Sequence, residues 1–472
     1  MKKIIVACFA ALLLVFGGVS SAQADEYLRV GMEAAYAPFN WTQDDDSNGA
    51  VPIEGTKQYA NGYDVQIAKK IAEAQGKKPL VVKTAWTGLI PALTSGKIDM
   101  IIAGMSPTAE RRQEIDFSDS YYRSEPVMVV SSDGDYANAK SLKDFKDAKI
   151  TAQQGVYLYN LIDQIPDVSK QTAMGDFGAM RQALASGIID GYVSERPEAK
   201  TAEEASSKYK MISLKDGGFQ VSDDDVSLAV GLRKGDNQQM EQVNKVLAGI
   251  SQEKRVKLMD HIIDIQPADK TDEAKKGNFF SQVTTIIAKN WPQFLRGTAI
   301  TLLISIIGTV VGTFIGLMIG VYRTAPKAAN KFVALLQKIF GWFLNVYIEV
   351  FRGTPMIVQS MVIYYGTAQA FGINIDRTLA AIFIVSINTG AYMSEIVRGG
   401  IFAVDKGQFE AATALGFSHG QTMRKIVLPQ VIRNILPATG NEFVINIKDT
   451  SVLNVISVVE LYFAGNTVAS QT

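Results

Sequence analysis

Cysteine and histidine are scarce in this sequence. Its 472 residues include one cysteine, Cys8, and two histidines, His261 and His419. A single cysteine can form neither an intrachain disulfide nor a cysteine-based metal site, and two histidines leave little material for histidine-centred catalysis. The phosphate-binding pattern G-x-x-x-x-G-K-[ST] is missing as well. We therefore expect no catalytic residues, no metal site and no cofactor, and we expect any ATP hydrolysis to belong to a separate subunit.

The chain also lacks a net charge, because 47 Lys and Arg residues balance 47 Asp and Glu residues. Without a basic excess there is no electrostatic footprint for nucleic acid. The charges are unevenly distributed, however. Residues 297–472 contain only twelve Lys or Arg and eight Asp or Glu, so a polar N-terminal part is joined to an apolar C-terminal part. The length alone predicts two or more domains.

The first 24 residues have the pattern of a secretory signal peptide. Lys2 and Lys3 precede an apolar run over residues 4–19, and Ala22-Gln-Ala24 follows it. A charged start, a short apolar stretch and an A-x-A site together are typical of a cleaved signal, whereas a membrane anchor is usually longer. We expect cleavage after Ala24, so that residue 25 begins outside the membrane.

Apolar stretches in the C-terminal part predict four membrane spans, over residues 298–322, 353–375, 378–394 and 434–459. A helix needs about 20 residues to cross the hydrocarbon, and the uncharged first stretch is long for a buried core helix. Lys and Arg concentrate in the first and third connections, and such loops are cytoplasmic. An amphipathic helix over residues 278–296 is expected at the membrane interface before the first span.

The polar part alternates β-like runs with helical patterns. Strands are expected over residues 27–32, 80–84, 98–103, 148–152 and 188–193, with helices over 64–75 and from 86. This alternation predicts parallel sheets covered by helices, and about 240 residues suit two lobes with a cleft. Ligands of such sheets lie outside the carboxyl ends of the strands. Residues 266–277 are polar and are expected to be a linker.

Two sets of motifs lie in the apolar part. Glu410-Ala-Ala-Thr-Ala-Leu-Gly416, followed by Ile426-Val-Leu-Pro429, resembles the EAA loop of the permeases of bacterial ATP-binding-cassette (ABC) importers. The stretches at 352–355, 392–400, 441–443 and 448–451 resemble the polar amino-acid branch of those permeases. The resemblance implies an all-α transmembrane permease domain over residues 278–472. It also implies that a separate ATPase docks at Glu410, Ala411, Ala412 and Gly416. Because the family has one more span after about Glu460, we expect the last family helix to be missing.

The polar part resembles the periplasmic-type amino-acid-binding proteins. The motifs are Tyr36-Ala-Pro-Phe39, Gly62-Tyr-Asp64, Gly88-Leu-Ile-Pro-Ala-Leu93, Ala103-Gly-Met-Ser106, Glu110-Arg111 and Asp116-Phe-Ser-Asp119. The resemblance implies a two-lobe α/β domain over residues 25–265, with the second lobe at about 131–215.

The same resemblance assigns the ligand contacts. Arg111 would bind the α-carboxylate with help from the Ser106 hydroxyl and the Ala103 carbonyl, and Glu195 would bind the α-ammonium. The remaining expected contacts are the aromatic Tyr36 and Trp86 beside the ligand side chain, Gln153 in the second-lobe loop 153–157, and Glu33, which would favour a cationic or amide side chain. In that loop Gly155-Val156 stands where the family often has Gly-Thr.

These observations favour a fused substrate-binding and permease subunit of an amino-acid ABC importer. Its expected partners are an L-amino acid, polar or cationic such as glutamine or arginine, an ABC ATPase and a second copy of itself. It would be a multi-pass protein of the cell membrane, with the binding domain outside and the EAA loop in the cytoplasm. A ligand-gated channel with the same two-lobe module is the alternative, but a channel needs no EAA loop. An enzyme on this fold would need an acid–base pair and would leave the spans unexplained.

Overall fold

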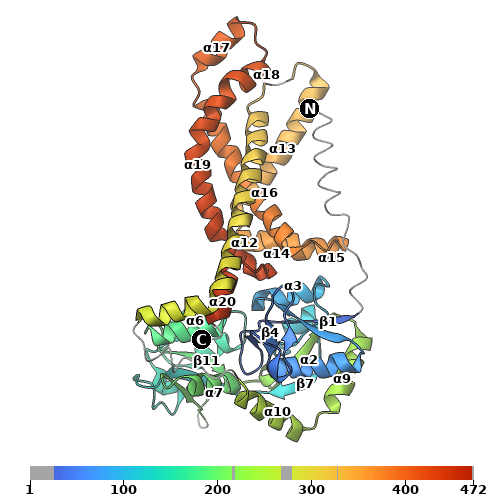
Figure 1. Cartoon of the computed structure of the whole chain (residues 1–472), viewed down its shortest axis with the longest axis vertical. Helices are drawn as coiled ribbons and strands as arrows, with labels where there is room; N and C mark the ends of the chain where they lie inside the picture. The colour runs from blue at the N-terminus through green and yellow to red at the C-terminus, as the bar shows by residue number, and fades with distance from the viewer. Residues whose placement is uncertain (1–25, 215–217, 267–278, 327, 470–472) are drawn as a thin grey trace. The chain divides into compact units, whose positions relative to one another are not determined.

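The computed structural model describes residues 26–214, 218–266, 279–326 and 328–469. These residues form two compact units (Figure 1). The first extends to Trp291 and includes residues 368–374 and 464–472, and the second comprises Pro292–Thr367 and Ile375–Phe463. The expected signal peptide and nearly all of the expected linker over residues 266–277 lie outside the described residues.

The first lobe of the N-terminal unit is built on a five-stranded sheet of order β5-β1-β6-β13-β7. Its strands are β1 (Tyr27–Met32), β5 (Lys78–Lys83), β6 (Met100–Ile101), β7 (Asp116–Arg123) and β13 (Ser227–Leu232). Helices α2 (Tyr63–Ala74), α3 (Leu89–Thr94) and α9 (Asn237–Ala248) pack against it. A small sheet of β2 (Trp41–Gln43), β4 (Tyr59–Asn61) and β3 (Val51–Pro52) lies beside α2.

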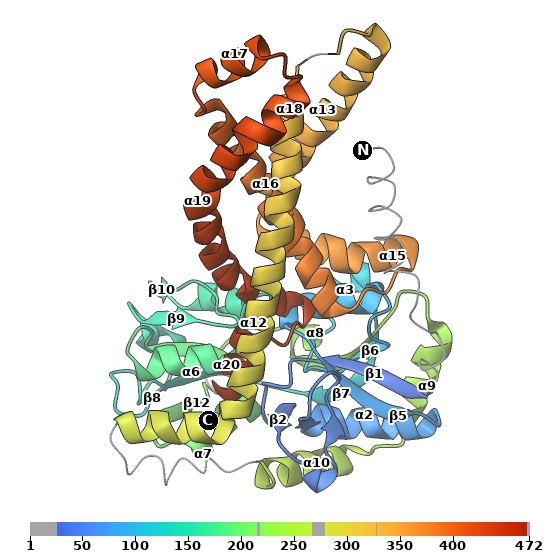
Figure 2. The same ribbon diagram turned by 45° about the horizontal axis from the view of Figure 1, so that its top comes forward.

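The second lobe repeats this plan with the sheet order β10-β9-β11-β8-β12 (Figure 2). Its strands are β8 (Pro126–Ser131), β9 (Lys149–Thr151), β10 (Ser169–Lys170), β11 (Gly191–Glu195) and β12 (Tyr209–Ile212). Helices α6 (Phe177–Ala185) and α7 (Arg196–Ala205) pack on β8 and β11. Shorter helices complete the unit: α4 (Arg111–Glu114), α5 (Leu158–Leu161), α8 (Asp223–Val226) and α10 (Gln252–Asp264).

The expectation of parallel sheets is wrong in part. Strand β1 runs parallel to β5 and β6, and β9 runs parallel to β10 and β11, as expected. However, β13 is antiparallel to β6 and β7, and β8 is antiparallel to β11 and β12. The cause is the double crossing of the chain between lobes. Strand β7 leaves the first lobe and β13 re-enters it, so the two lie side by side in opposite directions.

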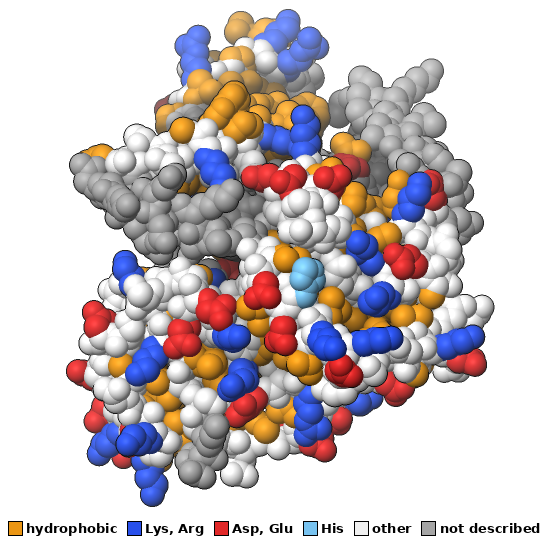
Figure 3. Space-filling view, turned by 60° about the horizontal axis from the view of Figure 1, so that its bottom comes forward, with side chains coloured by type: hydrophobic (Ala, Val, Ile, Leu, Met, Phe, Trp, Pro, Cys, Tyr) orange, Lys and Arg blue, Asp and Glu red, His pale blue; other side chains and the backbone are white. Residues whose placement is uncertain are grey.

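The local sequence explains the elements that form the lobes. In α2, Val65, Ala68 and Ile71 recur on one face and are fully buried against the first sheet. Strand β11 is buried at every residue because both faces of its sheet are covered. The core of the second lobe gathers Met128, Phe145, Ile150 and their neighbours. On the face that Figure 3 presents, acidic and basic side chains are interspersed without an excess of one sign.

The second unit is helical. Its main helices are α12 (Phe279–Arg323), α13 (Lys331–Gly353), α16 (Arg377–Phe402) and α19 (Leu428–Asp449). Shorter ones are α14 (Met356–Met361), α17 (Lys406–Ala414) and α18 (His419–Thr422), whereas most residues of α15 (Thr367–Phe371) and α20 (Leu461–Ala469) belong to the first unit. In the part of the chain that the structure describes, α12, α13 and α16 are long and apolar enough to cross a membrane, and a bent pair over residues 419–469 gives up to a fourth span. The predicted interfacial helix and first span form one helix, α12.

The predicted second span over residues 353–375 is wrong. The candidate span is α13, which ends at Gly353. Pro355 follows and cannot continue an α-helix in register. The next residues form two short helices and a π-turn over Val362–Gly366. Lys338, Glu349 and Arg352 interrupt the apolar stretch of α13, so this helix contains no long uncharged run.

Four glycines let α12 and α16 approach closely. Gly308, Gly312, Gly316 and Gly320 recur every fourth residue and so share one face of α12. A Cβ atom at these positions would lie 2.5–2.6 Å from a side-chain atom of Val385, Thr389, Met393 or Val397 respectively. Small residues at such a spacing are the usual way in which membrane helices bring their backbones together.

A buried amide ties three of the helices of this unit to one another. Asn446 of α19 donates from Nδ2 to Thr309 Oγ1 of α12 at 2.9 Å and to Thr389 Oγ1 of α16 at 3.0 Å. Thr389 Oγ1 donates in return to Asn446 Oδ1 at 3.1 Å. Within hydrocarbon such interhelical hydrogen bonds satisfy groups that have no water to turn to.

Candidate functional site

A small cavity lies between the two lobes of the N-terminal unit. Its lining comes from loops at strand ends in both lobes. The first lobe contributes Tyr36, Trp86, Gly104, Ser106 and Arg111, and the second contributes Gln153, Val156, Tyr157, Leu158, Phe177 and Glu195. Six of the eight expected substrate-binding residues are therefore brought together from positions up to 159 residues apart.

Tyr36 and Glu195 join the lobes across this cavity. The Tyr36 hydroxyl donates to Glu195 Oε2, and both side chains are buried. Burial raises the pKa of Glu195 to about 7 and raises the pKa of Tyr36 well above its usual value. The Tyr36 ring stacks on Phe177 of the second lobe, with ring centroids 4.7 Å apart. Gly104 makes room for that ring, since a Cβ there would lie 2.6 Å from Tyr36 Cε1 and its φ is +64°.

Arg111 is the cationic group of the cavity. Its Nη1 donates to Ser106 O at 2.8 Å, and its Nη2 donates across the lobes to Gly155 O at 2.9 Å. The guanidinium lies 5.1 Å from the centre of the Trp86 ring, and Trp86 Nε1 also donates to Gly155 O at 3.1 Å. Burial lowers the pKa of Arg111 to about 10, so it stays charged at neutral pH. The aromatic face and the two carbonyls hold a planar cation in a fixed orientation.

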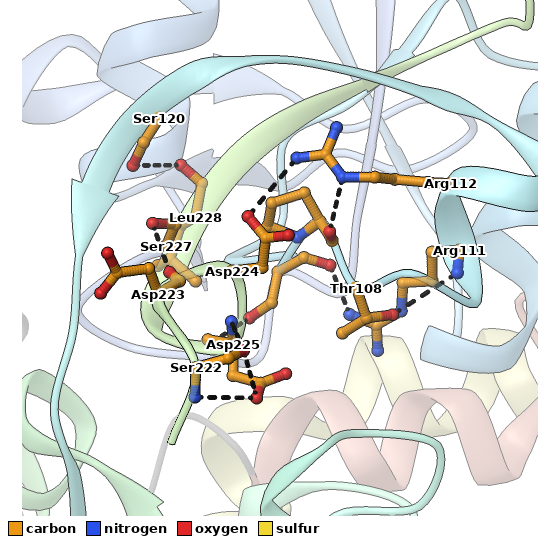
Figure 4. A network of polar contacts seen from close by, with 12 residues as sticks. Thr108, Arg111, Arg112, Ser120, Ser222, Asp223, Asp224, Asp225, Ser227 and Leu228 are labelled. Atoms are coloured by element: carbon orange, nitrogen blue, oxygen red, sulfur yellow. Dashed lines mark hydrogen bonds and ion pairs between the residues drawn. The ribbon is translucent and has the colours of Figure 1, made fainter.

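The loop that carries Ser106 and Arg111 is attached to α8 (Figure 4). The Ser106 hydroxyl donates to the Asp225 carbonyl at 2.7 Å, and Arg112 pairs with Asp224 at 3.7 Å. Ser222 and Asp225 form a capping box that fixes the start of α8. Because the one proton of the Ser106 hydroxyl is used here, its oxygen can accept a hydrogen bond from a ligand but does not donate one.

Asp64 supports the Gly104 turn from behind. Gly104 N donates to the Tyr121 hydroxyl at 3.0 Å, and that hydroxyl donates to Asp64 Oδ1 at 2.8 Å. Asn40 Nδ2 donates to the other carboxylate oxygen of Asp64 at 2.8 Å. Burial raises the pKa of Asp64 to about 7. The Gly-Tyr-Asp motif thus places a buried acid where it orients the backbone next to the cavity.

Glu33 lies behind Gln153 rather than in the cavity lining. Gln153 Nε2 donates to both carboxyl oxygens of Glu33, at 2.9 and 3.0 Å, and to Gly175 O at 3.3 Å. Burial raises the pKa of Glu33 to about 8, and burial lowers the pKa of Lys83 to about 7. Ala103 is buried directly before Gly104 and is also outside the lining. The Gln153 amide therefore lines the cavity and separates it from the Glu33 carboxyl.

Five lining residues were not among the expected contacts: Gly104, which lies in the Ala103–Ser106 motif, and Val156, Tyr157, Leu158 and Phe177 of the second lobe. Val156, Tyr157 and Leu158 lie in or next to the second-lobe loop that the resemblance had indicated, but no local pattern shows which of their side chains face the cavity. Phe177 is the first residue of α6, directly after the Asp176 N-cap. Its position follows from the packing of the two lobes, which the sequence does not display.

Three of the four expected ATPase-docking residues lie on the short helix α17 of the second unit, and Gly416 follows its C-terminal end. In α17, Glu410 and Ala411 are exposed whereas Ala412 is buried. Phe417 N donates to Ala412 O at 3.0 Å and Gly416 N donates to Thr413 O at 2.9 Å, which together form a Schellman cap. Gly416 has φ of +79°, a conformation that favours glycine. Just before it, Leu415 is 76% exposed.

Comparison with known proteins assigns both units. Residues 28–261 match the bacterial extracellular solute-binding proteins of family 3, and residues 331–461 match the inner membrane component of binding-protein-dependent transport systems. The glutamine transport system permease protein GlnP of Escherichia coli K12 is 41% identical over 175 residues, which are 36% of this chain and 74% of that protein.

Two further relatives complete the comparison. The arginine transport system permease protein ArtQ of Bacillus subtilis 168 is 46% identical over 117 residues, 25% of this chain and 53% of that protein, so the chain spans about half of its length. A substrate-binding protein of an amino-acid ABC transporter from Streptococcus pneumoniae, solved with L-arginine, is 25% identical with a TM-score of 0.45, over 52% of this chain and 96% of that one.

The chain therefore belongs to the inner membrane components of binding-protein-dependent transport systems. It carries a family-3 solute-binding domain and a permease domain of the ABC-importer type in one polypeptide. Both matches are to transport components rather than to catalytic families, and neither supports the ligand-gated channel.

Proposed function

We propose that this chain captures an L-amino acid outside the cell and passes it across the membrane, driven by a separate ATPase. The observation that carries the proposal is that one cavity is lined by Arg111 from the first lobe and by Glu195 from the second. A guanidinium suits an α-carboxylate, and a carboxylate suits an α-ammonium. Because the two groups come from opposite lobes, a zwitterion of the right length would hold the lobes together at both ends.

The other end of the cavity favours a polar or cationic side chain. Gln153 offers an amide there, and Glu33 stands directly behind it. A cation beside Gln153 would lower the pKa of Glu33 and favour its carboxylate, and the Gln153 amide oxygen could accept a hydrogen bond from a ligand amide or guanidinium. Arginine and glutamine both meet this description, and the names of the two permease relatives contain the same two amino acids.

The ATPase would bind at Glu410, Ala411, Ala412 and Gly416. The helix presents small and acidic residues on its exposed face, and the exposed Leu415 at its end can enter an apolar groove of a partner. Phe409 of α17 packs against an apolar cluster that includes Val404, Met423 and Val427. Movement of α17 would therefore be transmitted to α16 and α19, which supply other residues of that cluster.

We further propose that two copies pair in the membrane. Three or four spanning helices in the described residues are few for a path that opens alternately on two sides. Arg323, Arg398, Lys406, Arg424 and Lys425 lie in or beside the first and third connections, which supports a cytoplasmic position for the EAA loop and an external one for the solute-binding unit. Cysteine cross-linking in native membranes should capture a homodimer.

A calorimetric screen of the twenty L-amino acids against the full chain tests the substrate class. We expect saturable binding of at least one polar or cationic L-amino acid with one site per chain, and no binding of its D-enantiomer, which cannot present both α-groups and its side chain correctly. Absence of binding to all twenty would contradict the proposal. Co-purification of an ATPase that is lost in Gly416→Asp would support the docking assignment.

A further inference from the structure

Helix α13 carries a stripe of polar side chains along one face. Its members are Lys338, Trp342, Asn345, Glu349 and Arg352, which follow one another at alternating intervals of four and three residues. Residues at this spacing share one side of a helix. All five side chains are exposed on the permease unit. Because α13 is long and apolar enough to cross a membrane, the charged members of this polar stripe need surroundings other than hydrocarbon.

The other two faces of α13 have clear surroundings. One face packs on the permease unit itself, where the Tyr347 hydroxyl donates to Ile387 O of α16. Another face is apolar and exposed, with Phe332, Phe343 and Val350, and it suits lipid tails. At about 100° per residue, the polar stripe lies between these two faces and belongs to neither.

The polar stripe reaches the middle of the membrane. Asn388 Nδ2 donates to Phe351 O of α13 at 3.2 Å, and Asn388 is the twelfth of the 26 residues of α16. With a rise of about 1.5 Å per residue, Asn388 lies roughly 16 Å from the start of that helix, about half the thickness of the hydrocarbon. Glu349 and Arg352 stand on either side of Phe351 and therefore lie at a depth where a charge that faces lipid is costly.

The charges of the polar stripe are not paired within one chain. Lys338, Asn345 and Glu349 make no hydrogen bond or ion pair with any residue that the structure describes. The Arg352 guanidinium lies 5.5 Å from the centre of the Tyr392 ring, and no carboxylate of the described residues pairs with it. Glu349 and Arg352 are opposite in charge and one turn apart, so together they can match the same two groups on another chain.

We propose that the polar stripe of α13 is the contact between two copies of this chain, with Glu349 of each copy paired with Arg352 of the other. In a pair related by a two-fold axis along the membrane normal, each stripe meets the same stripe of the second copy. The opposite charges are then matched twice, and the two Asn345 amides bond to each other near the axis. This inference rests on the proposed pairing of two copies and names the surface that they share.

Cysteine cross-linking in native membranes tests the surface. The background is Cys8→Ala, which leaves no other cysteine in the sequence. Under oxidation, Asn345→Cys should give a covalent dimer, whereas Phe343→Cys, on the exposed apolar face two residues away, should not. An equal or higher yield through Phe343→Cys would overturn the inference and leave the proposed pairing intact. Absence of both dimers would overturn the inference, and it would overturn the pairing as well if the unmodified chain is monomeric.

Charge exchange between copies tests the two ion pairs. Glu349→Arg makes both positions positive and Arg352→Glu makes both negative, so each variant alone should lose about tenfold or more of the dimer cross-linked through Asn345→Cys. When the two variants are coexpressed with different tags, they should form a mixed dimer, because two positive groups then meet two negative ones. A mixed dimer also shows that both variants fold. A stripe that only lines a water-filled path gives no such rescue, so absence of mixed dimers would overturn the pairing of Glu349 with Arg352.

Discussion

The solute-binding unit and the permease unit differ in the buried polar groups that join their parts, although the permease unit also buries the carboxyl groups of Glu442 and Glu460. Around the cavity the buried groups are ionisable, and burial shifts the pKa values of Glu33, Arg111 and Glu195 toward their neutral forms. In the interior of the permease unit the helices are joined by neutral groups, through Asn446 and through Asn388, whose Nδ2 donates to Gln359 Oε1 at 2.9 Å. The ion pairs of Glu395 with Arg323 and Arg398 involve partly exposed side chains.

This difference follows from what each region can do with a charge. The cavity keeps charges that a zwitterionic ligand would neutralise on binding, so their burial is a cost that binding removes. Hydrocarbon offers no such partner, so the permease unit uses amides, hydroxyls and close glycine contacts to hold its helices. The predictions below test each half of this contrast.

The largest effect is expected in the glycine contact between α12 and α16. A Cβ atom at Gly316 would lie 2.5–2.8 Å from Met393 Cβ and from nearby backbone atoms of α16, so Gly316→Leu cannot fit without a shift of the helices. Overpacking costs about 1–3 kcal/mol and more where backbone must move, so we expect loss of monodisperse protein after extraction in detergent. Gly341→Leu on α13 is the control, because a Cβ there meets nothing within 4 Å. Equal behaviour of the two variants would contradict the close contact.

The next effect concerns Arg111. Arg111→Ala removes the cation proposed to bind the α-carboxylate, and truncating one member of a buried charged pair costs about 2–5 kcal/mol. Amino-acid affinity should fall on the order of 30-fold or more. Arg112→Ala is the control, since this half-exposed neighbour pairs with Asp224 outside the lining. Calorimetry of both variants decides the assignment, which fails if they bind alike.

A smaller effect is expected from the pH dependence of Glu33. Its pKa is raised from 4.5 to about 8 by burial, so the folded protein binds more protons than the unfolded one in this range. Stability should therefore fall as pH rises from about 4.5 to 8. Glu33→Gln removes this pH-dependent loss. Relative to the unmodified protein, the variant should therefore gain stability at β1 as pH rises from about 5 to about 8. Hydrogen exchange of β1 peptides measures it, with the exposed Glu114→Gln as control. A difference that is flat with pH would contradict the buried neutral carboxyl.

The smallest effect is expected for the amide between the permease helices. Asn446→Leu removes its bonds to Thr309 and Thr389, and interhelical hydrogen bonds in membranes contribute about 0.6–1.7 kcal/mol. Detergent unfolding titrations should show a loss of that order. Asn441→Leu, at an exposed position of the same helix, should show none. A loss above that range would contradict the account that only neutral hydrogen bonds of this strength join these helices.

The sequence predicts best what is encoded locally. Strand β1 falls on the expected residues 27–32, and the expected helix over 64–75 is α2 within one residue at each end. The motifs also bring Arg111 and Glu195 to one cavity. Whether these residues contact a ligand stays a prediction.

What the sequence does not predict depends on distant parts of the chain. The antiparallel β8 and β13 result from two crossings between lobes, and Phe177, which stacks on Tyr36, reaches the cavity through the packing of the two lobes. The candidate span α13 was missed because charged residues within it interrupt the apolar stretch. The polar stripe of α13 is visible only once the bounds of that helix and its exposed residues are known.

Uptake by proteoliposomes tests the central claim most directly. The full chain and its ATPase are reconstituted with ATP inside, and a labelled amino acid identified in the binding screen is added outside without any separate binding protein. If one polypeptide supplies both capture and passage, uptake should be ATP-dependent and should be lost in Arg111→Ala but not in Arg112→Ala. Uptake that requires an added solute-binding protein, or that persists in Arg111→Ala, would contradict this account.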